Sequence, residues 1–397
     1  MPVSRIQRIL AVALVVVSPL AAQGRAVSLT GKPVAELEEP FTQITGIREL
    51  PGNRAVVVDA QEKTLQMVDF GKRSLSKISR NGSGPGEFQF PMSAFAGPAN
   101  VTWVADPMMQ KIHVVSPDGK ITSALLTPGG DGPGSLIFPQ GVDAKGRLYF
   151  QGNGFTPGQS TPSDTVPIVR WDPAVKRVDT VAWIPSGLIT SVSGGGNRAS
   201  FTIRMNPYSK ADAWGVLPDG RVAIVRADPY RVDIVEAPGR VRKGAAVAYT
   251  PVKIGAAERD AYRKGQGSGG GGGGSAVMLT RSVGGSSTSG GGGAPSAGTS
   301  VSRATPGAVA DADFPPVMPA FPARGVRTTP EGEIWVLRNR AASDKTPTYD
   351  IFDGTGKLVG KATLKPNSAI VGFGAGTAYV ARQDPEDDLR YLEKYAR

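Results

Sequence analysis

One pattern recurs six times along this chain and restricts its fold more than any other feature. A short apolar segment meets a glycine-containing turn, and a second segment rich in β-branched or aromatic residues follows. Such segments favour strands, and turns such as Asp219-Gly220 are typical of β-hairpins. A unit that recurs at a spacing of about 47 residues predicts a repeat architecture. The six units are residues 44–60, 92–106, 140–153, 214–228, 324–339 and 371–384.

The first strand of each unit carries a small residue at the same position. Glycine inside a strand weakens it and often marks a close approach of another backbone. Sheets arranged radially crowd most at their innermost strands, so a small residue repeated six times indicates a propeller axis. The residues at this position are Gly46, Ala94, Gly141, Gly215, Gly325 and Gly372.

Further apolar segments complete each unit. Third strands are expected at 111–116, 231–236 and 348–353, and a glycine turn and a fourth strand usually follow. Four antiparallel strands in each of six units predict an all-β, six-bladed β-propeller. A β-sandwich is the alternative, but a sandwich has no need to repeat the small residue. The sixth unit has only three strands, so we expect a strand within residues 26–39 to complete it and remove the open edge.

The run NGSGPGEFQFP at 81–91 combines turn residues with two phenylalanines. It lies between the first and second units, where the chain must turn back to the axis. We expect Phe88 and Phe90 to wedge between neighbouring sheets. We also expect Glu87 to bind nearby backbone amides or to pair with Arg80.

Two insertions interrupt the repeat, at 185–211 and at 255–313. The second contains Gly/Ser-rich runs at 265–275 and 284–300, whose composition is that of a flexible linker. A short helix is expected at 256–264. The remainder cannot supply a hydrophobic core, and this predicts a largely disordered insertion between blades four and five.

Residues 1–23 have the pattern of a secretory signal peptide. Arg5 and Arg8 precede an apolar run at 9–17, small residues follow, and Leu20-Ala21-Ala22 is the expected cleavage region. The alternative is an uncleaved anchor. We expect a propeller of residues 24–397, exported to the periplasm or outside the cell, with no other membrane span and as a monomer. The chain has no cysteine, so its fold depends on its core alone.

Four segments resemble the bacterial six-bladed propellers of the NHL-repeat-like group, which are secreted or envelope proteins. The resemblance extends from about residue 26 to the end, apart from the Gly-rich insertion, and specifies blade geometry rather than activity. Related lyases and lactonases have several metal ligands at the channel mouth, and this sequence lacks that pattern. The segments are RNGSGPGEFQFP (80–91), PEGEIWV (330–336), YDIFDGTGKLVGKATL (349–364) and AYVARQDPEDDLRYLEKY (378–395).

Few residues suggest catalysis. His113 is the only histidine and there is no cysteine, which leaves almost no ligands for zinc. The acidic run at 384–388 lacks the spacing of a calcium loop, and no GxSxG motif is present. A carboxylate pair for glycoside hydrolysis is not identifiable from sequence alone. We therefore predict no catalytic residue, no metal site and no cofactor.

A binding role is the remaining interpretation. Residues beside the small-residue position can reach the channel mouth, and the candidates are Gln43, Gln140, Trp214 and Arg324. Trp214 could stack on a flat ligand and Arg324 could hold a carboxylate or phosphate; packing between blades is the alternative for each. The net charge of +11, or +9 without Arg5 and Arg8, favours an anionic partner. No basic cluster interleaved with aromatic residues indicates nucleic-acid binding.

The sequence thus predicts a non-catalytic, exported propeller that binds a protein, a glycan or another envelope component. One alternative is a hydrolase or lyase that uses carboxylates at the channel. The other is a purely structural scaffold.

Overall fold

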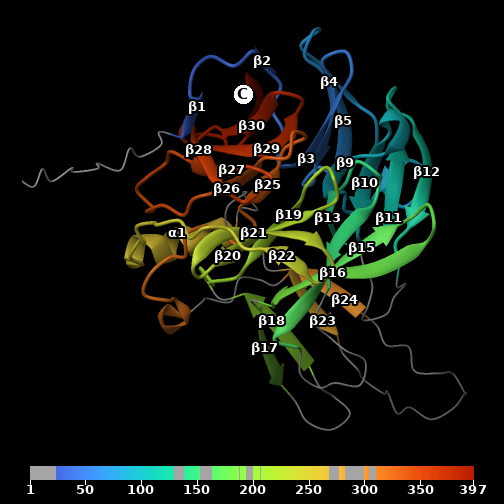
Figure 1. Ribbon diagram of the computed structural model, residues 1–397. Coiled ribbons are helices and arrows are strands. Elements are labelled where there is room, and N and C mark those ends of the chain that lie inside the picture. The colour runs from blue at the N-terminus through green and yellow to red at the C-terminus, as the bar shows by residue number, and fades with distance from the viewer. Residues whose placement is uncertain are drawn as a thin grey trace, which may run out of the picture.

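The blades of the molecule form a closed ring of six antiparallel sheets (Figure 1). The computed structural model describes residues 24–128, 138–152, 163–186, 188–193, 200–205, 207–267, 277–281, 299–303 and 310–397. The predicted six-bladed β-propeller is therefore confirmed. The proposed signal segment, residues 1–23, lies outside the described residues.

Each blade runs outward from an inner strand near the axis, and consecutive strands of a blade pair in order. Blade one is β3 (Ile44–Leu50), β4 (Arg54–Asp59), β5 (Thr64–Asp69) and β6 (Ser74–Lys77). Blade two is β9 (Ser93–Ala96), β10 (Thr102–Asp106), β11 (Lys111–Val115) and β12 (Ile121–Leu126). Blade three is β13 (Pro139–Val142), β14 (Leu148–Gln151), β15 (Thr165–Asp172) and β16 (Arg177–Pro185).

The second half of the ring repeats this order. Blade four is β19 (Ala213–Val216), β20 (Val222–Ala227), β21 (Tyr230–Ala237) and β22 (Arg240–Arg242). Blade five is β25 (Val326–Thr328), β26 (Ile334–Leu337), β27 (Thr348–Phe352) and β28 (Leu358–Leu364). Blade six has β29 (Ser368–Gly374), β30 (Thr377–Gln383) and β31 (Arg390–Ala396) from the end of the chain.

The N-terminal segment closes the ring, as predicted. β2 (Ala35–Glu36) pairs antiparallel with β31 as the fourth strand of blade six. The same segment also adds β1 (Arg25–Leu29) in parallel to β28, which gives blade five a fifth strand. Leu29 is buried between blades five and six, and Leu37 and Phe41 are buried between blades six and one. Closure therefore combines paired strand edges with apolar burial.

The small residues of the inner strands permit close contact between neighbouring blades. A Cβ added to Gly46 would lie 2.6 Å from the backbone nitrogen of Ala94, and one added to Gly141 would lie 2.7 Å from Cγ2 of Val216. Both contacts are too short for a real Cβ, so these positions require glycine. Gly325 differs, because its added Cβ would meet Pro322 in its own turn.

The turn at 81–91 anchors blade one to blade two largely as expected. Phe88 is fully buried with Val58 and Leu65 of blade one and Val104 of blade two, whereas Phe90 is half-buried. Glu87 accepts hydrogen bonds from the backbone N–H of Gly84 (2.8 Å) and from Nε of Arg80 (2.6 Å). Both expected roles of Glu87 are thus present. The short strands of this turn are β7 (Arg80–Asn81) and β8 (Glu87–Phe88).

Two buried aspartates fix the starts of inner strands in equivalent ways. Asp59 accepts hydrogen bonds from the backbone N–H groups of Thr42 (2.8 Å) and Gln43 (3.2 Å). Asp106 accepts them from Gln89 (2.7 Å) and Phe90 (3.2 Å) in the next blade. Both carboxylates are buried completely, and these amide donors satisfy them. Each aspartate thereby holds the segment that leads into an inner strand.

The two insertions each contain a β-hairpin, and the hairpins lie side by side (Figure 1). β17 (Leu188–Ser193) pairs with β18 (Ser200–Met205), and β23 (Val277–Arg281) pairs with β24 (Thr299–Arg303). β18 lies against β23. Residues 268–276, 282–298 and 304–309, in which a largely disordered insertion is predicted, lie outside the described residues.

The helix at the start of the second insertion packs against Tyr208 of the first insertion and against Phe314, which directly follows the second. α1 (Ala256–Gly267) includes the predicted helix and extends beyond it. The ring of Tyr262 lies 5.2 Å from that of Tyr208 and 5.6 Å from that of Phe314, measured between centroids. The Tyr208 hydroxyl donates to the carbonyl of Glu258 (3.0 Å).

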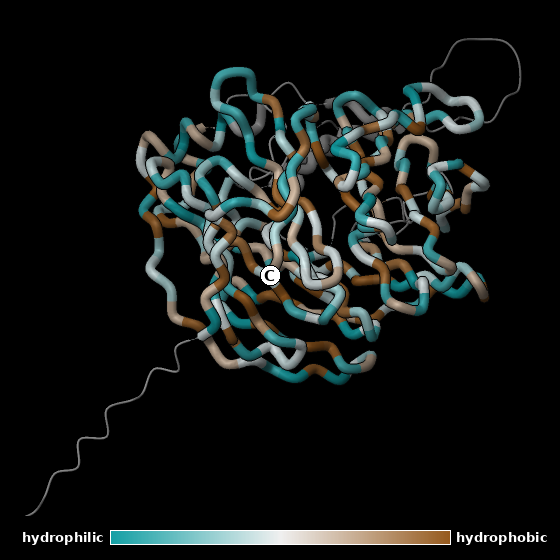
Figure 2. Tube along the Cα trace, turned by 90° about the horizontal axis from the view of Figure 1, so that it is seen from above, coloured by the Kyte–Doolittle hydropathy of each residue, from teal (hydrophilic) through white to brown (hydrophobic). Residues whose placement is uncertain are grey.

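Hydropathy follows the strands and turns. Figure 2 shows hydrophobic residues along the strands and hydrophilic residues at the turns that border the ring. The buried clusters join strands of adjacent blades, so the core is a series of interfaces around the axis. No helix in the described part of the chain has the length and apolar character needed to cross a membrane.

We expect ring closure to be essential for stability. Deletion of residues 24–40 removes β1 and β2 and exposes the edge of β31 together with apolar side chains. The shortened protein should aggregate or lose its cooperative thermal transition. A chain that begins at Gly24 is the matched control. A soluble monomer with the control's melting temperature would contradict the closure scheme.

The single histidine makes stability depend on pH. His113 is buried against Phe88, and its Nε2 atom has no hydrogen-bond partner in the described structure. Burial lowers the pKa of His113, while the charge of Asp106 partly opposes this effect. The unfolded chain therefore binds a proton at about pH 6.5, before the folded protein does, and stability falls as the pH decreases through this value.

His113→Leu should remove this loss of stability at low pH. We would compare urea midpoints of the two proteins at about pH 7.5 and about pH 5.5, a range in which few other groups titrate. An equal decrease in both proteins would show that His113 is not its source.

A candidate anion-binding site at the propeller axis

The antiparallel order of each blade places one set of loops on one face of the ring. Inner strands begin on this face, second strands end there, and third strands begin there. We call it the upper face. Gln43 and Arg324 lie just before inner strands, and Gln140 and Trp214 lie within the first residues of inner strands. Arg340 follows the second strand of blade five. The side chains of this face that surround the axis form the candidate site.

Arg324 is an exposed arginine held close to the protein. Its side chain is accessible to water, yet the protein around it removes solvation and lowers the pKa of its guanidinium. Both properties are expected of a side chain at the mouth of a propeller, with water on one side and protein on the others. Among the described residues it has no ion pair and no side-chain hydrogen bond. Its charge is therefore available to a ligand.

Arg327 and Arg340 add two more guanidinium groups from blade five. Burial lowers the pKa of both. Both positive charges act on the hydroxyl of Tyr349 and partly oppose the rise in its pKa that burial causes. Tyr349 is 3% exposed and accepts a long hydrogen bond (3.4 Å) from the backbone N–H of Ile370 at the start of β29. Tyr349 thus lies between blades five and six.

These arginines lack the carboxylate partners that other half-buried arginines have. Arg340 donates to the backbone carbonyl of Asp344 (3.1 Å). The negative charge of the Asp344 side chain partly opposes the lowering of the pKa of Arg340 by burial. Arg327 has no hydrogen bond or ion pair within the described residues. By contrast, short ion pairs hold Arg147 to Asp143 (2.6 Å), Arg170 to Asp179 (2.5 Å), Arg226 to Asp212 (2.7 Å) and Arg338 to Asp350 (2.9 Å).

Arg48 extends the positive charge along the axis toward the opposite face. It lies on β3, where burial lowers its pKa. Its Nε atom is buried without a hydrogen-bond partner in the described structure, and its Nη2 is 3.5 Å from Oδ1 of Asn100. The hydroxyl of Thr45, on the same inner strand, is also unpaired. Hydrogen-bond donors without acceptors therefore occur at both ends of the axis.

Such a set of side chains is suited to an anion. A guanidinium can form two parallel bonds to a carboxylate or phosphate. These bonds are stronger where water is partly excluded. We call Arg324, Arg327 and Arg340 the axial arginines; Tyr349 lies beside two of them and brings a hydroxyl.

Two of the four candidates from the sequence lie on the upper face in other blades. Gln43 is half-buried, and Asp59 binds its backbone. Gln140 is exposed and occupies a β-bulge between Pro139 and Gly141. The part of Gln43 and Gln140 in ligand binding stays a prediction.

Trp214 lies in the core. It is 6% exposed and packs with Tyr149 and Ile224 between blades three and four. Its indole N–H donates to Oε1 of Gln151 (3.0 Å). Stacking on a ligand requires an uncovered ring face, so packing between blades, the alternative considered from the sequence, explains Trp214 better. We leave it out of the proposed site.

The described residues contain no group of three or more histidine, aspartate or glutamate side chains placed to hold a metal ion. Their most buried carboxylates already have structural partners. Asp143, for example, binds Arg147 and the hydroxyl of Tyr149 (3.0 Å), and Glu393 binds Arg382 (3.0 Å) and Lys365 (3.2 Å).

The fold defines the class of protein: a six-bladed β-propeller. No protein-family model matches the sequence, and no curated protein matches it. Similar solved structures include a DUF4221 family member from Bacteroides vulgatus (8% identity, 92% of this chain and 99% of that chain, TM-score 0.45). Regucalcin, a calcium-binding protein from Agrobacterium tumefaciens, is 10% identical over 94% of this chain and 98% of that chain, with a TM-score of 0.44. A gluconolactonase from Xanthomonas campestris is 11% identical over 95% of this chain and 99% of that chain, with a TM-score of 0.44. Similarity this distant transfers no activity to this chain.

The unpaired arginines should cost stability. An uncompensated charge in a desolvated place is unfavourable, so Arg327→Met should stabilise the fold, by about 1 kcal/mol or more. Arg338→Met is the matched control, since it breaks an existing pair with buried Asp350 and should destabilise by about 3 kcal/mol. Urea unfolding of both variants measures the difference. Destabilisation by Arg327→Met would indicate that Arg327 has a structural partner after all.

Proposed function

We propose that this protein is an exported, non-catalytic binding propeller whose axial arginines hold an anionic group of its ligand. The observation that supports this most directly is the set of three guanidinium groups, of which Arg324 is exposed and Arg327 and Arg340 are half-buried, without an ion pair to a described carboxylate. Perturbed ionisable groups of this kind concentrate at functional sites. The ligand class is a protein, glycan or other envelope component that bears carboxylate or phosphate.

Export is part of the same proposal. It is supported by the basic and apolar pattern of residues 1–23. The positive net charge adds a general attraction toward anionic material of an envelope. A ligand attached to such material would be held by the axial arginines rather than by the charge of the whole surface.

The alternative is a hydrolase or lyase that uses carboxylates. Such an enzyme needs carboxylates that are free to exchange protons or attack. The buried carboxylates of Asp59 and Asp106, which hold the segments leading into inner strands, are occupied by backbone amides. A binding role therefore agrees better with the described side chains. A purely structural role does not account for arginines without partners.

We expect the mature protein to bind an oligosaccharide of uronic acids or inorganic pyrophosphate, measured by isothermal titration calorimetry. Arg324→Gln and Arg327→Gln should each weaken binding about tenfold or more, since a hydrogen bond to a charged group contributes about 1.5–3 kcal/mol. Affinity should fall with added salt and be unchanged by chelator.

Arg73→Gln is the matched control, because Arg73 is an exposed arginine in the turn between β5 and β6, on the opposite face. Equal affinity of all variants for both probes would place the site elsewhere. Turnover of a probe that disappears with chelator would overturn the non-catalytic proposal.

A further inference from the structure

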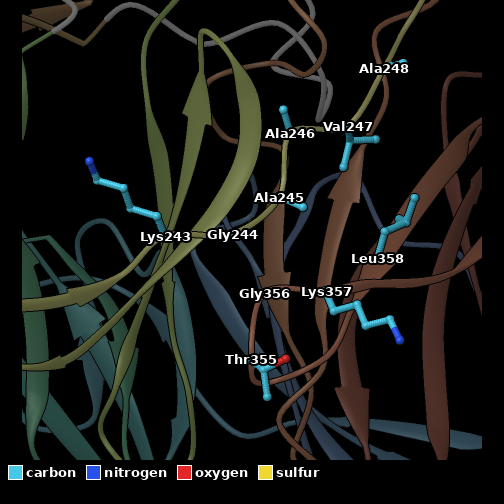
Figure 3. A pocket seen from close by; sticks show the side chains of 10 residues that line it. All are labelled: Lys243, Gly244, Ala245, Ala246, Val247, Ala248, Thr355, Gly356, Lys357 and Leu358. Atoms are coloured by element: carbon cyan, nitrogen blue, oxygen red, sulfur yellow. The ribbon is translucent and has the colours of Figure 1, made fainter.

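A groove lies between blades four and five, and none of the axial arginines lines it. It has a volume of about 610 Å³ and is formed by residues 243–248 and 355–358. Figure 3 shows Val247 and Leu358 facing each other across it, while the side chains of Lys243 and Lys357 extend away on opposite sides. The first wall follows β22, and the second is the turn between β27 and β28.

The first wall offers backbone groups without partners. Within 243–248, the N–H of Val247 donates to the carbonyl of Tyr230 (2.7 Å), and the N–H of Gly244 donates to Oδ1 of Asp233 (3.2 Å). The N–H groups of Ala245, Ala246 and Ala248 have no partner within the described residues. Successive N–H groups of an extended segment point to opposite sides, so those of Ala246 and Ala248 point away from Tyr230, to which Val247 donates. This side of the segment therefore resembles an open strand edge, to which another extended chain can add.

The side chains permit such an addition. Ala245, Ala246 and Ala248 are small and exposed, so a second backbone can approach closely. Val247 and Leu358 are half-buried and pack on the core shared by blades four and five. They provide an apolar floor for alternate side chains of an extended ligand. The groove thus has both the hydrogen-bonding groups and the apolar contacts that a peptide strand requires.

The charge around the groove selects the kind of peptide. Lys243 and Lys357 are exposed and form no ion pair with a described residue. No carboxylate lines the groove. Asp353 lies nearby, but its carboxylate is bound within its own turn by the N–H groups of Thr355 (2.9 Å) and Lys357 (3.1 Å). Positive charge therefore borders the groove on both sides.

We propose that this groove binds an extended, acidic segment of a partner protein by strand addition along residues 243–248. Backbone pairing with the alanines supplies affinity, Val247 and Leu358 receive apolar side chains, and Lys243 and Lys357 attract carboxylates. An acidic polysaccharide would use the lysines but would have no backbone amides for the unpaired groups. The proposal is independent of ligand binding at the axis.

The test uses the mature full-length protein and a fluorescein-labelled peptide of alternating glutamate and valine, followed by fluorescence anisotropy. Lys357→Glu should weaken binding about tenfold. Lys361→Glu is the matched control, since Lys361 is exposed on β28 but lies outside the groove. Ala245→Tyr, which fills the groove without changing charge, should abolish binding while the melting temperature stays near that of the parent.

Hydrogen exchange with and without peptide provides the second readout. Protection of the amides of Ala246 and Ala248 on binding supports strand addition. Binding that is insensitive to Lys357→Glu and Ala245→Tyr would overturn the proposal. Equally tight binding of dextran sulfate with no protection of these amides would also overturn it, because the groove would then recognise charge alone.

Discussion

The closeness of the inner strands at the axis is the constraint on which the rest of this structure depends. Gly46 leaves no space for a Cβ against blade two, and Gly141 leaves none against blade four. If these strands stood further apart, the apolar faces of the blades would separate and the buried clusters between them would open. The inner strands of these blades are therefore held close to their neighbours by packing at the glycines.

Periodic features of the fold were accessible from the sequence, because each follows from local chemistry repeated along the chain. The glycine position, the closing strand and the buried Phe88 are of this kind. The equivalent roles of Asp59 and Asp106 could also have been found, since their separation matches the spacing of the repeat. The pairing of β17 with β18 and the position of β18 against β23 could not be found from the sequence, because the insertions follow no repeat.

The candidate site was only partly accessible, for a physical reason. Arg324 could be identified from its position before an inner strand. The electrostatic effect of Arg327 and Arg340 on Tyr349, however, depends on how blade five meets blade six. Whether an arginine forms an ion pair is equally a property of the ring: Arg338 forms one with Asp350, whereas Arg340, two residues later, forms none with a described residue. Trp214 illustrates the converse, since its position near an inner strand's start was correct but its ring faces the neighbouring blade.

Blade five combines these features in a way that connects stability with binding. It carries all three axial arginines, whose desolvation opposes folding, and it forms one wall of the groove beside residues 243–248. It is also the blade to which β1 adds a fifth strand, with Leu29 fully buried against it. The added strand increases the apolar burial and backbone pairing of this blade. A blade reinforced in this way can tolerate unpaired charge at its inner edge without losing its shape, and preorganised donors bind an anion at a lower cost in entropy than mobile ones.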